Sequence, residues 1–130
     1  MFVDTSALYA ILDRDDANHA AAAAIFPTVL ASGRVVTHSY VMVETAALVQ
    51  HRLGMVAVRR LVDDLFGAVG VVWVDEQIHL SGVASLLAGG HGQISLVDYV
   101  SFDLMRRRGI TSAFAFDADF ARQGFELVQG

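Results

Sequence analysis

Four acidic residues lie in apolar stretches of this chain, where a carboxylate is uncommon unless it has a partner. Asp4 and Asp117 each follow a short apolar run, while Glu44 and Asp98 share helical spacing with apolar neighbours. Ionised carboxylates gathered in one cleft repel one another and raise their pKa values unless a cation lies among them. Because carboxylate oxygens suit hard divalent cations, the set of acids predicts a metal-ion site.

Each of these acids also has a structural alternative. Ser95 precedes Asp98 by three residues, which is the spacing of a capping box. Asp4 and Asp117 could cap the helices that follow them. Glu44 could form an ion pair with an arginine, although a lone buried ion pair adds little stability. For any single acid both interpretations stay open, and only the set favours a metal ion.

The residue types that are missing exclude other chemistries. The chain has no cysteine and no lysine, because all nine of its basic residues are arginine. Thiol nucleophiles, thiolate zinc sites and iron–sulfur clusters are therefore excluded, as are P-loop NTPases and Schiff-base enzymes. The five histidines are scattered, with no pair at the i, i+4 spacing, so zinc fits poorly. A phosphatase of the haloacid dehalogenase type would need a lysine and an acid at position 6, which is Ser6.

Composition predicts a folded chain that does not span a membrane. Hydrophobic residues make up 55% of the 130 residues and charged residues 18%. Polar residues interrupt each apolar run before it reaches membrane-spanning length. Asp4 and the acidic segment 13–16 stand where a secretory signal would have basic residues and a cleavage site, so we expect a cytoplasmic location. The formal charge of −5 argues against broad electrostatic binding of nucleic acid, but cations bound to the carboxylates would offset most of it.

Short apolar runs alternate with helical patterns along the chain. Strands are predicted at 1–3, 35–37, 71–74, 112–116 and 125–128, and helices lie between them. Asn18, Ser39 and Asp75 are expected to cap helices, and Pro27 to kink or break one. A loop is expected at 89–92. The larger aromatic residues are expected in the core: Phe26, Phe66, Trp73, Phe102 and Phe114.

Continuous apolar strands that alternate with helices indicate a parallel sheet covered on both faces. The predicted fold class is α/β, a three-layer α/β/α arrangement with a mostly parallel sheet of four to five short strands, in one domain over 1–130. Since the carboxyl ends of such strands face the ligand crevice, Asp4 and Asp117 should point into one cleft. Asp98 lies in the first turn of its predicted helix, where the helix dipole favours negative charge.

On these motifs the chain resembles PIN-domain ribonucleases, and in particular the VapC-type toxins of bacterial toxin–antitoxin pairs. The motifs are Asp4-Thr5-Ser6-Ala7-Leu8, Glu44, Ser95-x-x-Asp98 and Phe116-Asp117-Ala118-Asp119-Phe120. The first and last are specific as a pair, whereas the middle of the chain matches only in its pattern of helices. In two departures, Ser95 stands where threonine is frequent, and Tyr99 stands where a small residue is common.

The resemblance implies a metal-dependent endoribonuclease, usually a homodimer, held inactive by a small VapB-like antitoxin. It implies that Mg²⁺, with Mn²⁺ as a substitute, activates a water that cleaves RNA to leave a 3′-hydroxyl and a 5′-phosphate. Ser6 and Ser95 are expected to support the ligands, and Arg14 to contact a substrate phosphate. The ligands that the resemblance implies are Asp4, Glu44, Asp98 and Asp117, with Asp119 as a fifth candidate.

Two other functions stay open at this point. The same fold could serve as a non-catalytic domain that binds a protein or RNA, with the acids acting as caps. It could also belong to a DNA-directed nuclease, although such chains usually carry extra helical segments that 130 residues cannot hold. If an antitoxin docks on the second to fourth helices, those helices should expose apolar surface.

Overall fold

Five short strands form one parallel sheet in this computed structural model, which describes residues 1–90 and 92–129. The strands are β1 (Phe2–Val3), β2 (Val36–His38), β3 (Gly70–Val72), β4 (Ser112–Phe114) and β5 (Glu126–Val128). Their order across the sheet is β3-β2-β1-β4-β5, and every neighbouring pair is parallel. His91, in the loop predicted at 89–92, lies outside the described residues.

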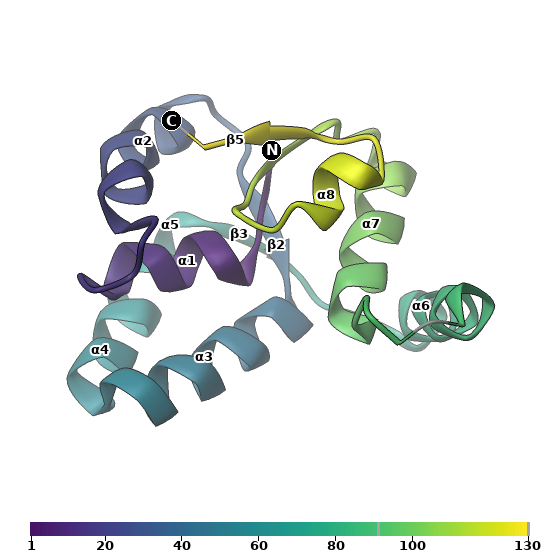
Figure 1. Cartoon of the computed structure of the whole chain (residues 1–130), viewed down its shortest axis with the longest axis horizontal. Helices are drawn as coiled ribbons and strands as arrows, with labels where there is room; N and C mark the ends of the chain where they lie inside the picture. The colour runs from purple at the N-terminus through teal and green to yellow at the C-terminus, as the bar shows by residue number, and fades with distance from the viewer. Residues whose placement is uncertain (91, 130) are drawn as a thin grey trace.

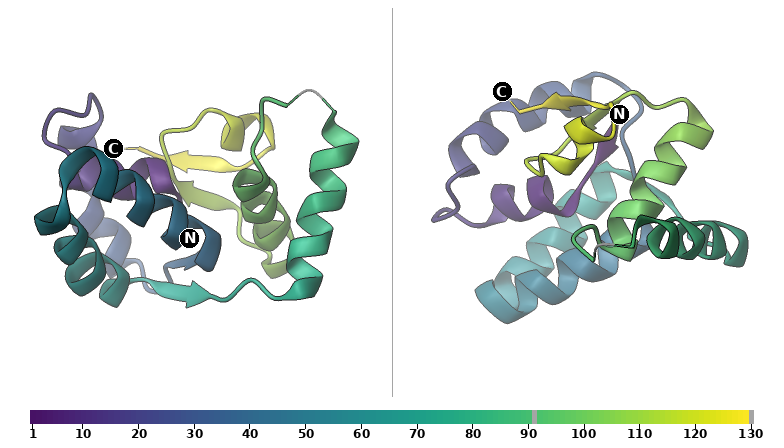
Figure 2. Two further views of the ribbon diagram at one scale, coloured as in Figure 1. Left: turned by 90° about the horizontal axis from the view of Figure 1, so that it is seen from below. Right: turned by 45° about the vertical axis from the view of Figure 1, so that its right-hand side comes forward.

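Helices cover both faces of this sheet (Figure 1). One face carries α1 (Thr5–Leu12), α2 (His19–Ala31), α3 (Ser39–Leu53), α4 (Met55–Arg60), the π-helical turn η1 (Leu61–Leu65) and α5 (Phe66–Ala68). The other face carries α6 (Glu76–Gly89), α7 (Leu96–Arg108) and α8 (Asp119–Arg122), as Figure 2 shows. The three-layer α/β/α prediction is confirmed, and no helix of the described residues is long and apolar enough to cross a membrane.

The central strands lie in the core. Phe2, Val3, Ala113 and Phe114 are fully buried, because helices pack on both faces of β1 and β4. Phe2 stacks on Phe120 of α8 on one side of the sheet. This double coverage explains why the strands appear in the sequence as continuous apolar runs without alternation.

Several local predictions are wrong. Trp73 is 73% exposed, because β3 ends at Val72 and the chain leaves the sheet before the tryptophan. Pro27 does not break α2, which continues from His19 to Ala31, and a kink there stays a prediction; the proline lies on the exposed side, where water can satisfy the carbonyl that loses its partner. Asn18 precedes α2 but makes no capping hydrogen bond with its side chain.

The cap of α3 is His38 and not Ser39. The Nδ1 atom of His38 accepts from the backbone N–H of Val41 at 3.3 Å, and its Nε2 lies 2.8 Å from Ser101 Oγ. Ser101 in turn donates to the carbonyl of Val97 at 3.0 Å, so His38 is neutral and donates through Nε2. Burial lowers the pKa of His38 to about 4. This buried imidazole therefore fastens the end of β2 to the first turns of α7.

We predict that His38 makes the protein less stable in acid. Since its pKa is about 4 in the folded state against an ordinary value of 6.5 for histidine, the stability it contributes is lost as pH falls from about 6.5 to 4. The free energy of unfolding of wild type minus that of His38→Gln should shrink over this window by up to about 3 kcal/mol. Urea denaturation of both proteins across the window measures it, and a constant difference would contradict the assignment.

Candidate active site

The parallel sheet brings the two strand-end acids together. Asp4 directly follows β1, and Asp117 lies three residues beyond the end of β4. The two strands are neighbours with Val3 opposite Phe114, and the backbone N–H of Asp4 donates to the carbonyl of Phe114 at 3.1 Å. Both acids therefore lie at the carboxyl edge of the sheet, as predicted.

Ser6 holds Asp4 in place. Asp4 is only 4% exposed, and its Oδ2 accepts hydrogen bonds from the N–H of Ser6 at 3.1 Å and from its Oγ at 2.7 Å. The same Oγ accepts from the N–H of Phe116 at 2.9 Å, which ties Asp4 to the segment that leads into Asp117. Asp4 is thus the cap of α1, as one interpretation had it, and it also lies beside the other acids.

Asp98 and Glu44 approach from two helices on opposite faces of the sheet. At the start of α7, Ser95 Oγ accepts from the N–H of Asp98 at 3.1 Å, so the serine is the cap. Among the described residues the Asp98 carboxylate accepts no hydrogen bond from the backbone N–H of Ser95, so the capping box is not completed. Glu44 makes no ion pair with a described residue, and the alternative of an arginine partner is wrong for the described part of the chain.

The charges of the four acids act on one another. Burial, followed by the negative charges of Asp4, Asp117 and Glu44, raises the pKa of Asp98 to about 7. Burial also raises the pKa of Asp4 to about 6, against the hydrogen bonds from Ser6 that lower it, and the charge of Asp117 raises it further. Acids that follow β1 and β4 and acids on α3 and α7 are therefore close enough to repel one another.

Asp119 belongs to the closest group of carboxylates. Oxygens of Asp98, Asp117 and Asp119 lie within 4.8 Å of one another, and all three residues are partly exposed. The N–H of Asp119 donates to Asp117 Oδ1 at 2.9 Å, while its own Oδ1 accepts from Arg122 at 2.6 Å. Oxygens bound to one small cation lie at most about 4–5 Å apart, so the three carboxylates fit a hard divalent ion. Asp4 and Glu44 lie outside this closest group.

Arg14 does not join the acids. It lies two residues beyond the far end of α1, which begins next to Asp4 and extends for eight residues or about 12 Å. Its side chain is exposed in the loop between α1 and α2. Its contact with substrate phosphate stays a prediction, and any such contact would be remote from the carboxylates.

Two buried polar contacts beside the acids were not predicted. Thr45 donates to Thr5 between their hydroxyl oxygens at 3.2 Å, next in sequence to Glu44 and Asp4, and so joins α3 to α1. The His38 and Ser101 contact joins β2 to α7 in the same way. In the sequence, Thr45 and Ser101 are small polar residues on otherwise apolar helix faces. That pattern suggests a buried hydrogen bond, but it does not identify the partner residue.

Comparison with known proteins agrees with this geometry, since residues 1–126 match the PIN domain. The chain belongs to the PIN-domain family. It is 34% identical to the 23S rRNA-specific endonuclease VapC20 of two Mycobacterium tuberculosis strains, over 99% of this chain and 98% of the relative. The crystal structure of Mycobacterium tuberculosis VapC20, described as a sarcin–ricin loop cleaving toxin, matches with a TM-score of 0.87. The match has 32% identity and covers 99% of this PIN-domain chain and 98% of that one. The resemblance inferred from the motifs is confirmed.

We predict that the Asp98 carboxylate destabilises the metal-free protein at neutral pH. Because folding raises its pKa from 3.8 to about 7, the stability it contributes is present below about pH 4 and is lost as pH rises through 7. Asp98→Asn lacks this titration. In EDTA the free energy of unfolding of the variant, relative to that of wild type, should therefore increase as pH rises from about 4 to 8. Denaturation with urea measures the difference, which must vary with pH if the acids interact as described.

Proposed function

We propose that this protein is a divalent-cation-dependent endoribonuclease of the VapC type. The observation that carries the proposal is the gathering of four carboxylates from distant parts of the chain, with the pKa of Asp98 raised first by burial and then by the charges of the other three. Such an arrangement is unfavourable by itself and becomes favourable around a cation. The related VapC20 is an endonuclease specific for 23S rRNA, which supports RNA as the substrate class.

The donor set fits Mg²⁺ or Mn²⁺, since every candidate ligand is a carboxylate oxygen. When bound, such a cation lowers the pKa of a water and stabilises negative charge on a phosphodiester. Asp98, Asp117 and Asp119 would hold it, and Asp4 is the neighbouring ligand that Ser6 orients. Glu44, reaching the group from α3, would help to hold a second ion.

The residues of this chain would orient the reaction rather than supply a nucleophile. Water oxygen bonds to phosphorus as the bond to the 3′ oxygen breaks, and the products are a 3′-hydroxyl and a 5′-phosphate. Ser6 keeps Asp4 in a single orientation, because its hydroxyl bonds both the carboxylate and the backbone of Phe116. Ser95 caps the first turn of α7 and so helps to hold Asp98 beside the carboxyl edge of the sheet.

We predict that Asp4→Asn lowers RNA cleavage by at least about hundredfold while the protein stays folded. Asparagine caps a helix as well as aspartate does, so the substitution removes a charge without removing the cap. The matched control is Asp75→Asn, because Asp75 caps α6 in the same way and is not among the interacting acids. Gel assays with an RNA that contains the sarcin–ricin loop, followed by end mapping, measure the effect. Cleavage by Asp4→Asn at the wild-type rate would sink the proposal.

A thermal-shift experiment separates this proposal from a non-catalytic PIN-like domain. Mn²⁺ should raise the Tm of the wild-type protein, because a cation that binds the folded state and not the unfolded state stabilises the folded state. It should have little effect on the Tm of Asp98→Asn, which lacks one of the ligands. The stabilisation should weaken toward about pH 5, where protons compete for Asp98 and Asp4. Equal Tm values with Mn²⁺ and with EDTA would favour the non-catalytic function.

We also propose that a small antitoxin contacts an apolar face on α3, η1 and the segment after β3. Val43, Val62 and Trp73 are each more than half exposed there. Together with Ser39, Met42, Ala46 and Phe66 they line a groove of about 290 Å³. An exposed apolar patch of this kind is typical of a surface that binds another protein.

The single tryptophan reports on this face. We predict that emission from Trp73 shifts to shorter wavelength when the protein is co-purified with its antitoxin, because the indole leaves water. For comparison, Trp73 emission is measured on the protein without antitoxin over a series of dilutions. A shift that depends on the protein's own concentration would assign the face to the homodimer, and unchanged emission in both cases would show that the face is not covered.

A further inference from the structure

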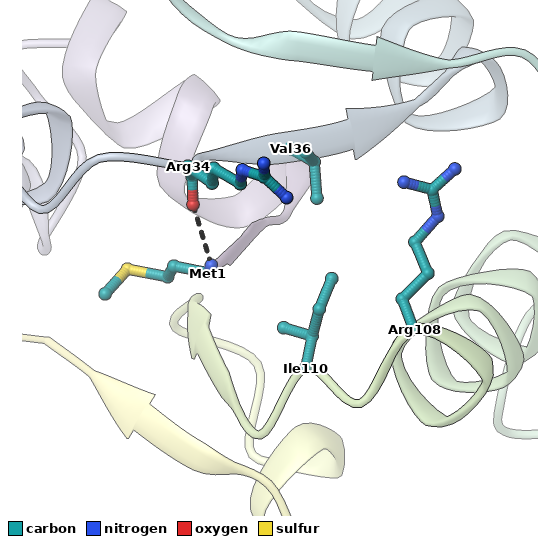
Figure 3. A pocket seen from close by; sticks show the side chains of 5 residues that line it. All are labelled: Met1, Arg34, Val36, Arg108 and Ile110. Carbon is teal, nitrogen blue, oxygen red and sulfur yellow. Dashed lines mark hydrogen bonds between the residues drawn. The ribbon is translucent and has the colours of Figure 1, made fainter.

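Figure 3 shows a cavity lined partly by arginine side chains, which lies at the edge of the sheet opposite the carboxylates. It has a volume of about 260 Å³ and is lined by Met1, Arg34, Val36, Arg108 and Ile110. Val36 begins β2, and Arg34 and Ile110 each lie two residues before a strand, β2 and β4 respectively. Because the strands are parallel, their amino ends meet at this edge just as their carboxyl ends meet at the acids.

The backbone at this edge is already satisfied. The nitrogen of Met1 donates to the carbonyl of Arg34 at 2.9 Å, and the N–H of Val36 donates to the carbonyl of Met1 at 2.9 Å. The side chains of Arg34 and Arg108 line the cavity from two sides (Figure 3). The cavity thus combines two guanidinium groups with an apolar floor of Val36 and Ile110.

Neither arginine has an acidic partner among the described residues. The ion pairs found there join Arg107 to Asp103 and Arg122 to Asp119. Glu126 begins β5 at the same edge but does not line the cavity. Two like charges that face one cavity repel each other, and an anion between them removes that repulsion.

We propose that Arg34 and Arg108 bind a phosphate group in this cavity. The planar guanidinium donates two parallel hydrogen bonds to phosphate oxygens, which a lone ammonium cannot do. The apolar floor strengthens the attraction by displacing water, and Val36 and Ile110 offer contact to the sugar or base attached to the phosphate. The cavity has room for a phosphate with its sugar, whether it belongs to a free nucleotide or to an RNA strand.

Helix α7 fixes the distance between this cavity and the acids. Asp98 lies in its first turn and Arg108 is its last residue, so the ten-residue interval separates the two by about 15 Å along the helix axis. A phosphate held at Arg108 is consequently not the one at the carboxylates. The site is independent of hydrolysis and can be tested without metal.

The first arm of the experiment uses free phosphate compounds. Amide NMR spectra of the ¹⁵N-labelled protein in EDTA are titrated with inorganic phosphate and with adenosine 5′-monophosphate at constant ionic strength. We expect saturable shifts at Arg34, Val36 and Ile110, and a loss of affinity of about tenfold in Arg34→Gln and in Arg108→Gln. Arg59→Gln is the matched control, since it removes the same charge from an exposed position on α4. Arg108→Lys keeps the charge and should recover only part of the affinity.

The second arm uses a labelled RNA of about 20 nucleotides, whose binding to the same variants is followed by fluorescence anisotropy in EDTA. Weaker RNA binding in Arg34→Gln and Arg108→Gln, with competition by the nucleotide, assigns the site to an RNA phosphate. Saturable binding of the nucleotide with unchanged RNA affinity assigns it to a free phosphate ester. If both variants bind phosphate, nucleotide and RNA as the Arg59→Gln control does, the proposal is overturned.

Discussion

Repulsion between carboxylates at one edge of a parallel sheet is the constraint on which this structure depends. A parallel sheet brings the carboxyl ends of its strands to one edge, so Asp4 and the segment that holds Asp117 become neighbours. Helices from both faces then add Glu44 and Asp98 to the same place. The strong burial of β1 and β4 directly beneath stabilises an arrangement that the acids alone oppose.

Hydrogen bonds between small polar side chains hold the acids in defined positions at this edge of the sheet. Each of them joins elements that lie far apart in the chain: Ser6 joins Asp4 to Phe116, Thr5 joins Thr45, and His38 joins Ser101. Each contact lies within a few residues of an acid. Hydrogen bonds in a buried setting tolerate little displacement, and they therefore limit how far the acids can move apart to relieve their repulsion.

The sequence predicts those features that depend on local chemistry. Helix caps at Ser95 and Asp75 follow from residue type and are present. Apolar runs locate the strands and the acids after them locate the site edge. Some features that depend on packing were predicted wrongly. Trp73 is exposed because β3 is short, and His38 replaces Ser39 as a cap because its ring has a partner on α7.

The candidate site shows the same division between local and packing effects. Motif spacing identified the acids, but it ranked Asp119 last, whereas the turn into α8 places that residue in the closest group with Asp98 and Asp117. Arg14 follows the acid motif closely in sequence, yet α1 places it at the helix end remote from Asp4.

Charge is distributed along α7 in a way that links the two edges of the sheet. Asp98 lies near the helix N-terminus and Arg106, Arg107 and Arg108 lie at its C-terminus, so each charge faces the end of the dipole that favours it. The dipole therefore offsets part of the cost of a carboxylate among carboxylates. An acidic protein that acts on a polyanion must concentrate its positive charge where the ligand lies. Because the chain has no lysine, the side chains that can supply permanent positive charge are all planar guanidinium groups.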